Sequence, residues 1–117
     1  MVKVLVSDSL SKEGLEVLSK APEIELDNRP GLSEDELAQA IGSYDGLVIR
    51  SGSKVTAKVI ERAERLRVIG RAGIGVDNVD VKAASRRGIV VMNTPTGNAV
   101  TTAEHALALL FAVARKV

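Results

Sequence analysis

Arginine, lysine, serine and glycine gather in three short segments of this sequence, each directly after an apolar run. The first is Arg50-Ser51-Gly52-Ser53-Lys54, the second runs from Gly70 to Gly75, and the third from Asn93 to Asn98. Arginine binds carboxylate or phosphate through a bidentate fork, lysine adds a compact charge, and glycine lets backbone N–H groups approach an anion. These residue types predict the binding of a small anion. Taken alone, the first segment also fits an ordinary solvated loop, and Asn98 or Thr101 could instead cap the helix that follows the third segment.

The glycines of the second segment resemble a dinucleotide-binding fingerprint but do not have the spacing that this motif requires. Counted from Gly73, the pattern G-x-G-x-x-G requires a glycine at position 78, where the sequence has Asn78. We therefore interpret Gly73 and Gly75 as allowing a substrate to approach the backbone, with Arg71 as a second cation. A tight turn closed by Asp77 and Asn78 explains the spacing equally well.

Five short apolar runs, rich in β-branched residues, alternate with helical segments and predict buried parallel strands. They lie at residues 4–6, 24–26, 47–49, 68–69 and 89–92. This alternation predicts an α/β fold, a flavodoxin-like three-layer sandwich whose five-stranded parallel sheet has the order 2-1-3-4-5. Ligands of such sheets bind at the carboxyl ends of the strands. The fold should therefore bring Arg50, Lys54, Arg71 and Asn98 toward one edge.

Local helix signals stand between these runs. Ser33 and Glu36 have the spacing of a capping box, and Leu32 with Leu37 fits the hydrophobic staple that often accompanies one. Thr56 is placed to act as the N-cap of the next helix. These signals predict where two of the helices begin.

The end of the sequence has an unusual pattern, because every residue from Ala106 to Ala114 is apolar. A helix that is apolar all round is normally buried on both sides. A central core helix is one interpretation. We favour a core of residues 1–100 followed by a helix over 101–117 that folds back or contacts another copy, giving a homodimer through residues 103–117. For His105, the only histidine, we expect a packing or interface role.

Composition excludes several classes of function. The 117 residues carry a net charge of +1 and no cysteine, which favours a single domain without disulfides or a thiolate metal site. The charges are dispersed, so we expect neither nucleic acid nor a membrane surface as a partner. The start of the sequence has no signal-peptide pattern and no apolar run is long enough to span a bilayer. We therefore expect a soluble cytoplasmic protein.

The sequence resembles the amino-terminal substrate-binding segment of the D-2-hydroxyacid dehydrogenases, and within them the phosphoglycerate dehydrogenases. The resemblance covers nearly the whole chain and is densest at residues 48–51, 70–80, 93–98 and 103–105. It implies a parent enzyme of serine biosynthesis that oxidises 3-phosphoglycerate to 3-phosphohydroxypyruvate with NAD. It also implies that the NAD-binding domain and the catalytic Arg, Glu and His lie beyond this segment. We therefore expect no bound cofactor and no dehydrogenase activity from this chain by itself.

The resemblance also implies roles for individual residues. It assigns the binding of a phosphorylated 2-hydroxyacid substrate to Arg50, Ser51, Gly52, Lys54, Arg71, Gly73, Gly75 and Asn98. It places Ile74 and Thr102 close to the cofactor. No catalytic residue and no metal ligand is expected in the chain.

Other functions fit an α/β fold of this size less well. A receiver domain would need an aspartate at the end of the 47–49 strand, where the sequence has Arg50. A flavin-binding protein would need a glycine-rich phosphate loop after the 4–6 strand, where Asp8 occupies the position of the phosphate. A free-standing anion-binding or self-associating module remains the alternative to a part of a dehydrogenase.

Overall fold

A computed structural model describes residues 2–8, 12–20, 24–50, 52–71 and 78–93. Within these ranges strands and helices alternate in the order β1 (Val2–Val6), α1 (Lys12–Ser19), β2 (Ile24–Asn28), α2 (Glu34–Ala40), the 3₁₀ helix η1 (Ile41–Ser43), β3 (Gly46–Ile49), α3 (Ala57–Arg62), β4 (Val68–Arg71), α4 (Val81–Arg86) and β5 (Val90–Asn93). The strands form one parallel sheet of order β2-β1-β3-β4-β5. The expected topology is confirmed.

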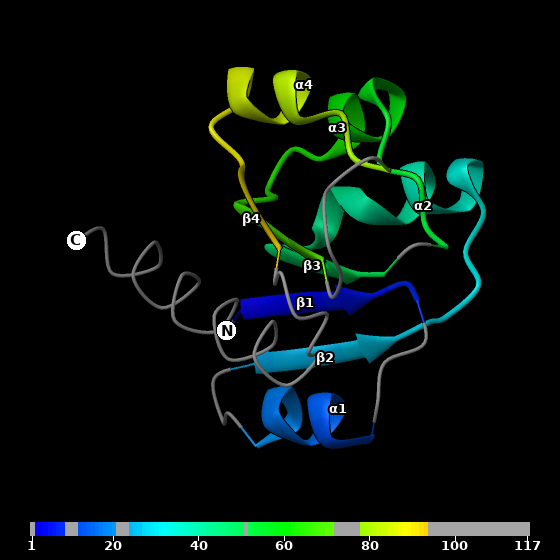
Figure 1. Ribbon diagram of the computed structural model, residues 1–117, viewed down its shortest axis with the longest axis vertical. Helices are drawn as coiled ribbons and strands as arrows, with labels where there is room; N and C mark the ends of the chain where they lie inside the picture. The colour runs from blue at the N-terminus through cyan, green and yellow to red at the C-terminus, as the bar shows by residue number, and fades with distance from the viewer. Residues whose placement is uncertain (1, 9–11, 21–23, 51, 72–77, 94–117) are drawn as a thin grey trace.

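The pleat of the strands sends alternate side chains into two apolar layers. Figure 1 shows α2, α3 and α4 together on one side of the sheet and α1 on the other. The sheet side chains that pack with α2, α3 and α4 are Leu5, Leu47, Ile49 and Ile69. Those in the layer with Leu18 of α1 are Val4, Val6, Val48 and Val68. Both layers are therefore closed by β-branched and leucine side chains, with little aromatic content.

The predicted capping box at the start of α2 is confirmed. The backbone N–H of Glu36 donates to Oγ of Ser33 at 3.2 Å, and the backbone N–H of Ser33 donates to Oε1 of Glu36 at 3.0 Å. This backbone hydrogen bond from Ser33 holds the pKa of the Glu36 carboxyl below its ordinary value. Leu32 packs against the apolar layer that contains Leu37, as expected for a staple.

Thr56 occupies the predicted N-cap position of α3, but its side chain forms no capping hydrogen bond. Its hydroxyl donates instead to the carboxylate of Glu34 in α2. Lys58 of α3 also pairs with Asp35 of α2. This hydrogen bond lowers the pKa of Asp35 and raises that of Lys58. The start of α3 is therefore fixed to its neighbouring helix.

The end of α4 is closed by a glycine that the sequence analysis did not single out. Gly88 has a φ of 74°, in the left-handed region that glycine adopts without steric cost. Its N–H donates to the carbonyl of Ser85 at 3.0 Å, and the N–H of Ile89 donates to that of Ala84 at 2.9 Å. These are the two hydrogen bonds of a Schellman motif, and they turn the chain into β5.

Several predictions for the end of the chain lie outside the described residues. These are the helix over 101–117, the dimer contact through 103–117, the environment of His105, and with them the boundary of the 1–100 core.

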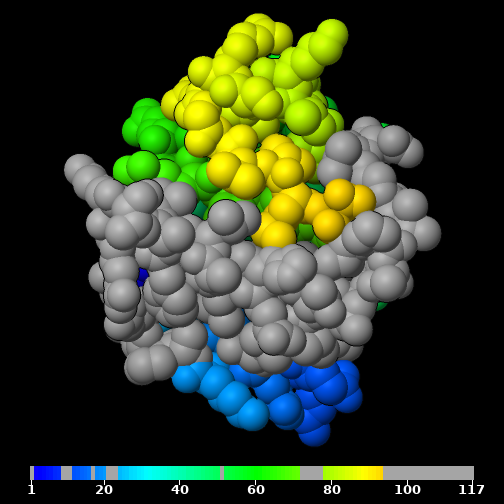
Figure 2. Space-filling view, turned by 60° about the vertical axis from the view of Figure 1, so that its left-hand side comes forward, coloured from blue at the N-terminus to red at the C-terminus, as the bar shows by residue number. Residues whose placement is uncertain are grey.

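Figure 2 shows α1, in blue, and residues 78–93, in yellow, at opposite ends of the visible surface. Among the described residues no helix is long and apolar enough to cross a membrane.

Candidate anion-binding site

The register of the sheet brings the ends of four strands to one edge. Val6 of β1 pairs with Val48 of β3, Val48 pairs with Gly70 of β4, and Gly70 pairs with Met92 of β5. The carboxyl ends of these four strands therefore lie side by side. This is the edge where the sequence predicted that the cations would meet.

Asp8, two residues after β1, is enclosed by the loop that follows β3. One of its carboxylate oxygens, Oδ2, accepts the backbone N–H of Arg50 at 2.7 Å and that of Ser53 at 2.9 Å. A Cβ added to Gly52 would lie only 2.7 Å from the other oxygen, Oδ1. Amides that the sequence analysis offered to an external anion thus donate, at Arg50 and Ser53, to a carboxylate of the chain itself. The close approach at Gly52 is to Asp8.

Two buried serines strengthen this junction. The hydroxyl oxygens of Ser7 and Ser53 lie 2.7 Å apart, and the hydroxyl of Ser53 also lies 3.2 Å from the carbonyl oxygen of Ser7, to which it donates. Both residues are almost completely inaccessible to solvent. The end of β1 and the loop after β3 are therefore joined by side-chain as well as backbone hydrogen bonds.

Asn78 also holds the backbone of this loop. Its amide nitrogen donates to the carbonyl of Arg50 at 2.7 Å and to that of Ser53 at 2.6 Å. Next to it, Val55 and Val79 form an isolated parallel bridge. The local spacing around Asn78 indicates only a failed fingerprint or part of a turn. It does not reveal this clamping role, because the partners of Asn78 are 25 and 28 positions away.

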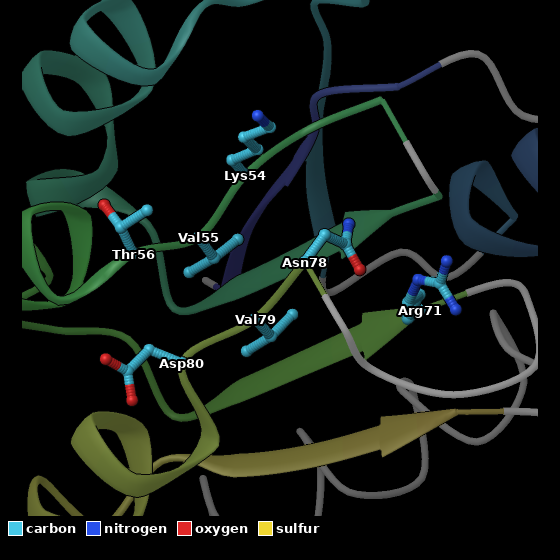
Figure 3. A pocket seen from close by; sticks show the side chains of 7 residues that line it. All are labelled: Lys54, Val55, Thr56, Arg71, Asn78, Val79 and Asp80. Carbon is cyan, nitrogen blue, oxygen red and sulfur yellow. The ribbon is translucent and has the colours of Figure 1, made fainter.

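A pocket of about 610 Å³ opens beside this clamp. Its lining residues, drawn in Figure 3, are Lys54, Val55, Thr56, Arg71, Asn78, Val79 and Asp80. Lys54 is exposed and Arg71 is half-buried. In the view of Figure 3, Asn78 and Arg71 occupy one end of the pocket and Thr56 and Asp80 the other. Oδ1 of Asp80 accepts the backbone N–H of Ala83 at 3.0 Å, so this carboxylate caps α4.

The pocket unites two of the predicted substrate-binding residues, Lys54 after β3 and Arg71 at the end of β4. Arg50 is exposed and joins the site through its backbone, which is held by Asp8 and Asn78. Gly52 is described but does not line the pocket, and its close neighbour is Asp8. The other predicted positions lie outside the described residues: Ser51, Gly73, Ile74, Gly75, Asn98 and Thr102.

The described part of the chain contains no group of three or more His, Cys, Asp or Glu side chains that could hold a metal ion. The polar groups that line the pocket are two cations, an amide, the hydroxyl of Thr56 and a carboxylate that already caps α4. Such a set favours an anion small enough to reach both cations.

Comparison with known proteins gives a consistent result along nearly the whole chain. Residues 4–115 match the family model described as D-isomer specific 2-hydroxyacid dehydrogenase, catalytic domain. D-3-Phosphoglycerate dehydrogenase of Synechocystis sp. is 48% identical over 117 residues, which are 100% of this chain and 21% of that protein. The human D-3-phosphoglycerate dehydrogenase is 45% identical over 115 residues, covering 98% of this chain and 21% of its own length. The chain thus spans about a fifth of the length of these curated relatives.

Solved structures agree with the sequence comparison. The crystal structure of NAD⁺-bound 3-phosphoglycerate dehydrogenase of Entamoeba histolytica has a TM-score of 0.72 and 31% identity, and the match covers 80% of this chain and 33% of that one. A protein of Thermus thermophilus has a TM-score of 0.73 and 37% identity, with 98% of this chain and 37% of that one covered. Both share the α/β fold described above.

Proposed function

Because the chain belongs to the D-isomer specific 2-hydroxyacid dehydrogenase family, we propose that it is the part of a D-3-phosphoglycerate dehydrogenase that binds the substrate anion. The observation that carries the proposal is that Lys54, in the loop after β3, and Arg71, at the end of the neighbouring strand β4, line one pocket. The substrate class is a phosphorylated 2-hydroxyacid, which offers a carboxylate and a phosphate at opposite ends of a three-carbon chain. A site with two separate cations fits a ligand with two anionic groups better than it fits a ligand with only one.

Each lining residue has a distinct task in this proposal. The guanidinium of Arg71, half-buried at one end of the pocket, binds one anionic group through its fork. The exposed Lys54 supplies a flexible point charge for the other. The backbone at Arg50 and Ser53 is fixed by Asp8 and Asn78, so binding must order the cationic side chains but not the backbone that carries them.

Oxidation of a 2-hydroxyacid requires a hydride acceptor, and we propose NAD for the whole enzyme. Its pyrophosphate does not fit the N-terminus of α2, whose first turn holds Glu34, Asp35 and Glu36, or that of α4, which Asp80 caps, because carboxylates there repel an anion. Since the chain spans about a fifth of the length of its curated relatives, we infer that NAD is bound mainly by other residues of the enzyme and that this chain alone transfers no hydride. A setting in serine biosynthesis belongs to the same proposal.

Isothermal titration calorimetry of the chain with 3-phosphoglycerate tests the proposal. Lys54→Gln should weaken binding by about 10- to 100-fold, since a hydrogen bond to a charged group contributes about 1.5–3 kcal/mol. Lys58→Gln is the matched control, because Lys58 is an exposed lysine of α3 that pairs with Asp35 and does not line the pocket. No binding by the unmodified chain, or equal affinity in the Lys54→Gln and Lys58→Gln variants, would contradict the proposal.

A homodimer through residues 103–117 remains part of our proposal, supported by the all-apolar run from Ala106 to Ala114. Multi-angle light scattering at high protein concentration should give twice the mass of the chain. Replacing Leu107 and Leu110 by lysine should return the mass to that of a monomer. A monomer at all concentrations would refute this part of the proposal.

A further inference from the structure

We propose that Asp8 is a positioning residue of the anion site: its buried carboxylate serves as an internal anion that holds the loop bearing Arg50 and Lys54 in its binding shape. This inference rests on the proposed function of the neighbouring pocket. It concerns a residue outside the predicted site set, one that the sequence analysis considered only as an obstacle to a phosphate.

Asp8 is buried and accepts hydrogen bonds from the backbone of a distant loop, unlike an ordinary carboxylate on the surface. The residue is 8% exposed, and one oxygen accepts two backbone N–H groups that lie 42 and 45 positions further along the chain. Hydrogen bonds to an ionised acceptor are about twice as strong as neutral ones. The carboxylate therefore determines where the loop backbone runs.

Gly52 shows that the loop is shaped around this carboxylate. A methyl group at position 52 would lie 2.7 Å from Oδ1 of Asp8, which is closer than real Cβ contacts. The loop can close over the carboxylate only because position 52 has no side chain. Asp8 and Gly52 are therefore coupled, and their substitutions should not have additive effects.

The loop is connected to the pocket through Ser53, whose hydrogen bonds fix the backbone next to Lys54. Ser53 is held by Asp8 at its N–H, by Ser7 at its hydroxyl and by Asn78 at its carbonyl. Lys54, the next residue, lines the pocket. Loss of the Asp8 carboxylate leaves the N–H groups of Arg50 and Ser53 without their acceptor, so the loop must rearrange and Lys54 with it.

The negative charge of Asp8 and its positioning of the loop should have opposite effects on the affinity for an anion, so the two can be separated by experiment. Asp8 carries a negative charge near a site for an anion, so a purely electrostatic effect would make binding tighter when that charge is removed. A positioning role requires the reverse. The sign of the change in affinity therefore separates the two effects.

The experiment measures 3-phosphoglycerate binding to the full chain by calorimetry. We expect Asp8→Ala to weaken binding at least 10-fold. Asp8→Asn should be intermediate, because a single amide oxygen can still accept both N–H groups. Gly52→Ala should weaken binding in the unmodified chain but add little to Asp8→Ala, since the oxygen it would meet is then absent.

Tyr44→Phe is the control for a general loss of stability, because it removes a hydrogen bond from the buried Tyr44 to Asp27 away from the loop. It should leave affinity unchanged. Should Asp8→Ala fail to fold, Asp8→Asn and Gly52→Ala decide the question. Binding by the unmodified chain together with equal or tighter binding by the Asp8 variants overturns this inference alone. No binding by the unmodified chain overturns the proposed function, and the inference with it.

Discussion

The side-chain amide of Asn78 donates to the backbone carbonyl of Ser53 at 2.6 Å, across 25 positions of sequence. The contact joins the loop after β3 to the segment that enters α4, and the bridge between Val55 and Val79 continues it. Two segments that could move independently are thereby made into one wall of the pocket.

This junction predicts a specific loss of stability. Asn78→Asp replaces the donor with an acceptor that faces two carbonyl oxygens, whereas Asn78→Ala only removes the donor. We expect a loss in the free energy of unfolding of about 1–3 kcal/mol for the alanine variant and a larger one for the aspartate variant. Urea unfolding followed by circular dichroism measures both.

Asn28→Asp is the control, because Asn28 is exposed at the end of the edge strand β2. It should change stability by no more than about 0.5 kcal/mol. If Asn78→Asp were as mild as this control, the clamp would have no energetic importance.

Gly88→Ala should destabilise the protein by about 1–2 kcal/mol, because the left-handed conformation at this position costs that much for a residue with a Cβ. Gly88→Asn should lose less, since asparagine tolerates the conformation better than alanine. Thermal unfolding of the two variants checks the order. Equal melting temperatures for the alanine variant and the unmodified chain would show that the Schellman motif does not matter for stability.

The elements that the sequence predicted are those specified by local pattern. The five β-branched runs predicted the strands and their order, and the spacing of Ser33 and Glu36 predicted the capping box, because both signals are complete within a few residues. β5 begins one residue later than its apolar run, at Val90 rather than Ile89, since Ile89 serves the turn that closes α4.

The parts that sequence reasoning missed depend on partners far away in the chain. The residues around Asp8 in the sequence do not indicate that its carboxylate accepts backbone N–H groups more than 40 positions later. Thr56 was correctly placed at a helix start, yet its hydroxyl donates to Glu34 of another helix, a partner 22 positions away in the sequence. For Lys54 and Arg71, which line one pocket, the fold class was sufficient, since parallel strand ends share one edge. The side chain of Arg50 does not line that pocket.

The capping box predicts a pH dependence of stability. The pKa of Glu36 is lowered in the folded chain, first by the backbone N–H of Ser33, so the folded state binds fewer protons at this group than the unfolded state does. Its contribution is complete above the ordinary glutamate pKa and is lost as the pH falls through the lowered one. Melting temperatures of the unmodified chain and of Glu36→Gln should therefore differ at neutral pH and converge in acid.

Ser33→Ala extends this test, because it removes the side-chain cap and should cost about 1 kcal/mol. The pH dependence should survive in this variant, since the backbone N–H of residue 33 still donates to Glu36. A constant difference between the unmodified chain and Glu36→Gln at every pH would refute the capping account.

We expect the chain to produce no NADH from 3-phosphoglycerate and NAD. In our proposal this chain supplies the binding of the substrate anion, and the carboxylates at the N-termini of α2 and α4 disfavour a pyrophosphate there. The absorbance of NADH, recorded over time at a high concentration of the chain, tests this prediction. Turnover by the unmodified chain that disappears in Arg50→Ala would show that the chain is itself a dehydrogenase.

The most direct measurement is an amide-resolved NMR titration of the chain with 3-phosphoglycerate, followed by NAD. A second depression, of about 460 Å³, lies at the opposite edge of the sheet and is lined in part by Arg65, Arg67 and Arg87, so it reports non-specific attraction of anions. Our account predicts shifts at Lys54, Arg71 and Asn78, with little change at those arginines and none caused by NAD. Shifts centred on Arg65, Arg67 and Arg87, or no shifts at all, would contradict it.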